Sequence, residues 1–218
     1  PISLRQLGPG PSSKPKGIHM RQTTINFETG KAIEVAFATI TKGKENQIFG
    51  EYFPKVGPIV QKYDGAPLGS IAIEGVHSNI GTPQMGALFQ WKSPADFQNL
   101  NKDPEFLEVK PIRDNAMDFF TNGHFFKTET SQPVDFEEGQ HYALIAEWTE
   151  GSWKPNGGQS ALVSLTPISD DPDQEFAPSK LHICAWDDAF MPSSSNGNAS
   201  GNGTPDVFKF KLNFPPQT

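Results

Sequence analysis

Four ionisable residues have side chains that could serve an acid–base reaction: Arg113, Glu74, His77 and His124. The guanidinium group of Arg113 is of the kind that holds a carboxylate or an enolate through paired hydrogen bonds. Glu74 ends an apolar, strand-like run, and it becomes a general base if it is desolvated. Both residues also have a structural interpretation, an ion pair at a helix end for Arg113 and a solvated strand end for Glu74. The sequence leaves these alternatives open.

The histidines and the single cysteine predict neither a metal nor a cofactor. Two histidines on neighbouring strands, such as His77 and His124, could bind a metal, but the chain has no His-x-His and no His-Glu-x-x-His spacing. Cys184 is the only cysteine and lies in an apolar run, which predicts an inert thiol. A lone cysteine excludes an internal disulfide and fits a reducing compartment, which favours the cytoplasm.

Phenylalanine is unusually common, with 17 Phe against 3 Tyr and 4 Trp. Because its ring carries no polar tip, most of these side chains are expected in a core or in an apolar pocket. Phe37, Trp91 and Phe120 are our candidates for the lining of such a pocket, and packing in the core is the alternative. Phenylalanines at 119–126 cover both faces of one strand-like run, so a second layer must cover one of those faces.

Composition excludes several other classes of function. The net charge is −7 and no cluster of Lys and Arg is present, which argues against a nucleic-acid partner. No apolar run approaches the roughly 18–20 residues of a membrane span, so no membrane partner is expected. The chain also lacks a phosphate-binding glycine loop and a Gly-x-Ser-x-Gly elbow. The partner that stays open is a small apolar ligand.

The first half of the chain alternates between strand-like and helix-like patterns. Apolar residues alternate along 33–37, which predicts a strand, and recur at three- and four-residue steps along 44–64, which predicts a helix kinked by Pro54 and Pro58. Further strands are expected at 68–76, 85–91 and 117–129, and further helices begin at Ser93-Pro94 and Asp103-Pro104. The order βαββαβ is that of the ferredoxin-like α+β unit.

A series of short motifs in the first half resembles a known family. They run in order as Tyr63-Asp64-Gly65-Ala66-Pro67, Ser70-Ile71-Ala72-Ile73-Glu74-Gly75, Leu88-Phe89-Gln90-Trp91, Ser93-Pro94-Ala95-Asp96-Phe97, Asp103-Pro104-Glu105-Phe106 and Ile112-Arg113-Asp114. Over about residues 31–128 this order resembles a family of small bacterial domains of unknown function in the dimeric α/β-barrel superfamily. The chain departs from that pattern at Asp64, where Gly is usual, at Phe106, where Tyr is common, and in its long second half.

The resemblance implies two facing sheets that enclose an apolar pocket. Superfamily members include cofactor-independent monooxygenases, isomerases and haem-handling enzymes, and the fold alone does not select among them. Arg113 takes the place of the helix arginine of the family.

The second half of the chain is rich in strand-like runs and has no long helix-like run. Residues 25–31 resemble 134–140, and 88–97 resemble 183–190. This half is therefore either a decayed second copy of the first or a set of strands that match by coincidence. In either case we expect its sheet to pack on the first sheet, within one chain or within a homodimer, because an uncovered sheet face needs another layer.

We therefore predict three segments: a flexible N-terminal arm at 1–24, a ferredoxin-like domain at 25–130 and a β-rich half at 131–218 that contains a surface loop at 193–205. The first functional hypothesis is a small-molecule-binding or assembly module with an apolar pocket between the facing sheets. The alternative is a cofactor-independent enzyme of the monooxygenase or isomerase type, acting on a small aromatic or polyketide-like substrate.

Overall fold

The computed structural model describes residues 21–78, 81–153, 160–168, 176–186 and 205–213. The part of the chain that the structure describes is mostly β-structure, with 47% of those residues in strands. Its elements, in chain order, are β1 (Gln22–Phe27), β2 (Ala32–Ile40), the π-helix η1 (Gln47–Tyr52), α1 (Phe53–Lys62), β3 (Ala66–His77), β4 (Met85–Trp91), α2 (Pro94–Leu100), α3 (Pro104–Asp114), β5 (Met117–Thr121), β6 (Phe125–Lys127), β7 (Gln132–Glu137), β8 (His141–Glu147), β9 (Ala161–Pro167), β10 (Lys180–Ala185) and β11 (Asp206–Asn213).

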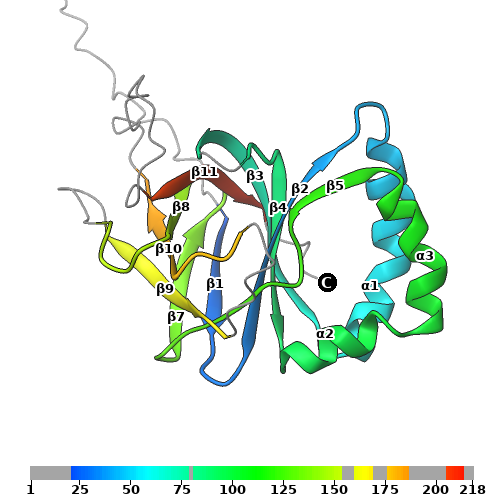
Figure 1. Cartoon of the computed structure of the whole chain (residues 1–218), viewed down its shortest axis with the longest axis horizontal. Helices are drawn as coiled ribbons and strands as arrows, with labels where there is room; N and C mark the ends of the chain where they lie inside the picture. Colours follow the sequence, from blue (N-terminus) through cyan, green and yellow to red (C-terminus); the bar gives the residue numbers. More distant parts are fainter. Residues whose placement is uncertain (1–20, 79–80, 154–159, 169–175, 187–204, 214–218) are drawn as a thin grey trace, which may run out of the picture.

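Eight strands close into a barrel in the order β2, β4, β3, β11, β8, β10, β9 and β6, which returns to β2. All of these pairings are antiparallel. The helices gather on one side of the barrel, and β8, β9 and β10 form the opposite side (Figure 1). A barrel satisfies the backbone donors and acceptors at the sheet edges that an open sheet leaves unpaired.

Two of these pairings join the first half of the chain to the second. β11 pairs with β3, where Val207 lies opposite His77, and β9 pairs with β6, where Phe126 lies opposite Pro167. The two halves are thus one hydrogen-bonded wall. The expectation of a second sheet packed face to face on the first is wrong.

The barrel interior is a continuous apolar core. Residues that alternate along β2, among them Ile33, Val35 and Phe37, point inward and are fully buried with residues of β8–β11. The two-stranded ribbon of β1 and β7 contributes its buried face to the same core. The other face of β2 and β4 carries Ala32 and Trp91, which pack under α1, α2 and α3.

The segments 25–31 and 134–140, matched in the sequence, are symmetry-like partners in the fold. Ile25 of β1 lies opposite Val134 of β7. Both segments end in a turn with a glycine in the left-handed region, Gly30 at φ +80° and Gly139 at φ +81°. The strand order β5-β2-β4-β3 of the first half also recurs as β11-β8-β10-β9. Duplication of the chain itself stays a prediction.

The expected fold class, a ferredoxin-like α+β domain of the dimeric α/β-barrel type, is wrong. The helices lie where the sequence predicts them, and α1, α2 and α3 each carry a proline at their first turn. The error concerns the sheet. In the expected fold β3 and β6 would be edge strands, whereas in the structure β3 pairs with β11 and β6 pairs with β9 of the second half. Local patterns determine elements, whereas the closed barrel depends on pairing between distant strands, 41 positions apart for Phe126 and Pro167 and 130 for His77 and Val207.

Three further expectations concern segments at the margin of the structure. The N-terminal arm predicted at 1–24 lies outside the described residues up to position 20, and β1 begins at Gln22. The surface loop predicted at 193–205 lies outside them up to position 204. Near Pro54, where a kink was predicted, the helix changes type. The π-helix η1 ends at Tyr52 and the α-helix α1 begins at Phe53.

Two glycines give a matched test of the packing. A Cβ on Gly86 of β4 would lie 2.5 Å from the Ala36 carbonyl oxygen and 2.5 Å from Cδ1 of Phe37, whereas one on Gly57 of α1 meets nothing within 4 Å. Gly86→Ala should lower the free energy of unfolding by about 1–3 kcal/mol through overpacking. Gly57→Ala should change it by less than about 1 kcal/mol, because the gain in helix propensity is opposed by the Cδ of Pro58, which crowds a Cβ on the helical residue before it. Urea denaturation measures both, and a Gly86→Ala variant as stable as the wild type would contradict this packing.

Candidate functional site

Three polar side chains from three elements meet in the apolar layer between the helices and the barrel wall. Glu34 comes from β2, Tyr52 from the end of η1, and Arg113 from the last turn of α3. Their exposed fractions are 2%, 6% and 8%. Buried ionisable groups are costly unless they are partnered, so their convergence marks this layer as the candidate site.

Local sequence places each of the three side chains. Glu34 lies between Ile33 and Val35, which face the barrel interior, so strand alternation turns its carboxylate toward the helices. Tyr52 is the last residue of a π-helix, a form found frequently at functional sites. Arg113 lies in the last turn of a helix whose N-cap, Asp103, accepts hydrogen bonds from two backbone N–H groups.

The Glu34 carboxylate is held by two donors. Trp91 Nε1 donates to Oε2 at 3.0 Å, and the backbone N–H of Gly123 donates to Oε1 at 2.8 Å. Burial raises the pKa of Glu34 to about 7, and these two hydrogen bonds and the charge of Arg113 offset only part of that rise. Glu34 therefore gains and loses a proton near neutral pH, as an acid–base group must.

Arg113 supplies the positive charge of the site. Its Nη2 and Nε lie 2.7 Å and 2.8 Å from Oδ1 of Asp114, and its guanidinium carbon lies 4.9 Å from the ring centroid of Phe119. Asp114 and Phe119 are exposed, so Arg113 connects the buried layer to the surface. Burial raises the pKa of Tyr52, and the charge and hydrogen bond of Arg113 oppose that rise. Because the pKa is raised, the Tyr52 hydroxyl stays protonated and can donate a hydrogen bond.

Of the four ionisable residues predicted from the sequence, the structure brings only Arg113 to this site. Glu74 is exposed, with Oε2 2.8 Å from His141 Nε2 and Oε1 2.8 Å from Lys211 Nζ. The Lys211 hydrogen bond is the main cause of the lowered pKa of Glu74, which keeps it a carboxylate. His77 ends β3, and His124 is buried with its ring 4.8 Å from that of Phe126.

The residues expected to line a pocket lie on different sides of the barrel wall. Phe37 points into the barrel, where its ring centroid lies 5.0 Å from that of Phe208 and 6.0 Å from that of Phe176. Trp91 lies on the outer face, beneath the helices. The side chain of Phe120 is outside the described residues. The structure therefore does not bring Phe37 and Trp91 to one surface.

Glu34 and Tyr52 are not among the site residues that the sequence predicts. The signal for Glu34 was available, because the same face of its strand carries the apolar residues Ala32, Ala36, Ala38 and Ile40. A single carboxylate on such a face must be buried wherever a helix covers the strand. Tyr52 lies four positions from Ile48 and Val56 on the predicted apolar helix face, so its burial was predictable, but no local pattern indicates that it meets Arg113.

Other chemistry has little support among the described residues. Cys184 is buried in β10, and burial raises the pKa of its thiol to about 12, so the thiol stays protonated. In the ranges that the structure describes, no three His, Cys, Asp or Glu side chains are placed to hold a metal ion. No helix in those ranges is long and apolar enough to cross a membrane.

The raised pKa of Glu34 has a measurable consequence for stability. Between its ordinary value of 4.5 and about 7, the folded state binds the Glu34 proton more tightly than the unfolded state does. The free energy of unfolding should therefore fall by up to about 3 kcal/mol as the pH rises through this window. Urea denaturation across the window should show this fall in the wild type and in Glu28→Gln, an exposed control, but not in Glu34→Gln. The same fall in Glu34→Gln would place its source elsewhere.

A scan against protein-family models finds no match to the chain, and a search of the curated proteins finds no relative. The family resemblance of residues 31–128 therefore stays a prediction, and the site must be interpreted from its own geometry.

Proposed function

We propose that the chain is a cofactor-independent enzyme of the isomerase type, which moves a proton on a small aromatic or polyketide-like carbonyl compound. The observation that carries the proposal is the meeting of a carboxyl group, a phenol and a guanidinium group in one apolar layer. Proton abstraction next to a carbonyl needs a base that titrates near neutral pH and donors for the oxygen that becomes negative.

Each group has a defined role in the proposed reaction. The Glu34 carboxylate takes a proton from the carbon next to the carbonyl, and the electron pair of the broken C–H bond moves to the carbonyl oxygen. Arg113 and the Tyr52 hydroxyl stabilise the resulting enolate. Glu34 then returns the proton to a carbon of the enolate, so atoms and charge balance without a cofactor.

The surroundings of Arg113 favour an aromatic substrate. The guanidinium carbon lies 5.8 Å from the ring centroid of Phe106 and 4.9 Å from that of Phe119. Because Phe119 is exposed, a planar ligand can approach the arginine from the surface beside it. The barrel interior is a poorer candidate for a binding pocket, since Phe37, Phe208 and Phe176 pack against one another there.

Solvent hydrogen exchange tests the proposal directly. Wild-type protein in deuterated buffer should catalyse deuterium incorporation next to the carbonyl of members of a panel of small aromatic ketones and β-diketones, followed by proton NMR. Glu34→Gln should reduce the rate about 100-fold or more, and Tyr52→Phe should reduce it less. The rate should rise with pH and level off above about 7, as Glu34 ionises.

Glu28→Gln is the matched control, because Glu28 is an exposed carboxylate at the end of β1 and should leave the rate unchanged. Exchange that Glu34→Gln retains in full would exclude the proposed base. Ligand-induced shifts of the Trp91 indole signal without any exchange would instead support the binding-module alternative.

A further inference from the structure

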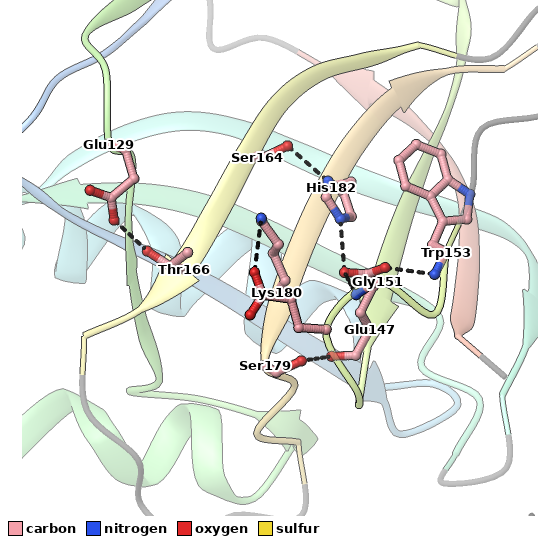
Figure 2. A network of polar contacts seen from close by, with 10 residues as sticks. Glu129, Glu147, Gly151, Trp153, Ser164, Thr166, Ser179, Lys180 and His182 are labelled. Atoms are coloured by element: carbon pink, nitrogen blue, oxygen red, sulfur yellow. Dashed lines mark hydrogen bonds and ion pairs between the residues drawn. The ribbon is translucent and has the colours of Figure 1, made fainter. Parts of the chain in front are cut away.

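A second polar network crosses three adjacent strands on the side of the barrel opposite the helices (Figures 1 and 2). His182 lies on the central strand β10, Ser164 on β9 and Glu147 on β8. Ser164 and His182 are direct cross-strand partners, and Glu147 is the partner of Lys180, two residues before His182. The pleat therefore places the three side chains in a row across one face of the barrel.

The two ring nitrogens of His182 face different side chains of this row. Ser164 Oγ lies 2.8 Å from Nδ1 of His182 in a hydrogen bond, whereas Nε2 of the same ring lies 3.4 Å from Oε2 of Glu147 without hydrogen-bond geometry. In the tautomer with its proton on Nε2, the imidazole presents that proton to the carboxylate and a lone pair to the serine hydroxyl. Ser164 can then donate its hydrogen to His182.

Both ends of the imidazole are held in place. Glu147 is 2% exposed, and its Oε1 accepts a hydrogen bond of 2.6 Å from the backbone N–H of Trp153. Ser179 Oγ donates to the Glu147 carbonyl oxygen at 2.8 Å. The ring of Trp153 packs over His182 with a centroid distance of 4.7 Å. Figure 2 shows the carboxylate and the indole on one side of the ring and Ser164 on the other.

The imidazole is kept in its neutral, basic form. Burial lowers the pKa of His182, the nearby carboxylate of Glu147 opposes that change, and the charge of Lys180 adds to it. His182 is only 7% exposed, whereas Ser164 is half-buried and can be reached by a small molecule. A hydroxyl beside a neutral, oriented imidazole is the usual arrangement of an activated nucleophile.

We propose that Ser164, His182 and Glu147 form a nucleophile–base–carboxylate triad that accepts acyl groups from small esters. Ser164 Oγ bonds to the carbonyl carbon of the ester while its proton passes to Nδ1 of His182. The C–O bond to the alcohol then breaks, and the alcohol leaves with that proton. Water then attacks the acyl-serine with His182 again as base, releasing the carboxylic acid and restoring Ser164.

The same strand provides a matched control for the nucleophile. Thr166 lies on the same face of β9, two residues from Ser164, and its hydroxyl donates to Oε1 of Glu129 at 3.1 Å (Figure 2). Its hydrogen-bond partner is a carboxylate, so the hydroxyl is oriented in the same way but has no imidazole base. A purely structural network predicts no acylation above background at either hydroxyl, whereas the triad predicts acylation at Ser164 alone.

The test uses the full chain and p-nitrophenyl acetate. We expect a burst of p-nitrophenolate and one acetyl group on Ser164 by peptide mass spectrometry, in the wild type and in Thr166→Val. Ser164→Ala should lose both signals, and His182→Gln should acylate about 100-fold more slowly. The acylation rate should rise with pH and level off below the ordinary histidine value of 6.5, because the neutral imidazole is the base.

Absence of acetyl-Ser164 in the wild type would overturn the proposal, and so would an undiminished burst in Ser164→Ala. Acylation of Ser164 that His182→Gln leaves unchanged would show a merely accessible hydroxyl and would also overturn it. The triad shares no residue with the Glu34 site, so these outcomes are independent of those for ketone exchange.

Discussion

The antiparallel pairing of β11 with β3 and of β9 with β6 is the constraint on which the rest of the structure depends. Without these two ladders each half would leave an open edge and an uncovered apolar face. With them, the inward side chains of all eight strands meet in a single core that phenylalanines fill. Both candidate sites lie on the outer face of the wall.

The two outer faces solve the problem of buried charge in different ways. Beneath the helices, Glu34 is desolvated so strongly that its neutral form persists to about pH 7, although an indole, a backbone amide and Arg113 favour the anion. On the opposite side, His182 is desolvated toward its neutral form while its hydrogen bond with Ser164 sets its orientation beside Glu147. In each case burial sets the protonation state and hydrogen bonds set the direction, which is the division of roles that acid–base chemistry requires.

Sequence patterns predicted the local elements because helix starts and strand alternation are short-range properties. Ser93-Pro94 and Asp103-Pro104 begin helices as expected, and Asp103 caps its helix with its side chain. Barrel closure was missed because it depends on which distant strands pair. Alternation of apolar and polar residues shows which face of a strand is buried, but it does not show which strand is its partner. Arg113 was found by its type and position, whereas Glu34 was overlooked between apolar neighbours. The triad was missed because its members lie 17 and 18 positions apart on separate strands, and register alone brings them together.

The symmetry-like relation between the halves explains why the Glu34 site occurs once. The offset that aligns Ile25 with Val134 also aligns Ala32 with His141 and Glu34 with Ala143. Trp91 pairs with Ala32, and correspondingly the backbone N–H of Trp186 donates to the carbonyl oxygen of His141. Both halves therefore place a tryptophan beside this position, but only the first adds a carboxylate there. Trp186 packs with Ala143 and Cys184 in an apolar cluster, where a carboxylate would lack the Gly123 and Arg113 partners that make Glu34 tolerable. A buried acid can persist only where the surrounding chain supplies its donors, so the turn at Gly123 and the last turn of α3 are as much a part of the site as Glu34 itself.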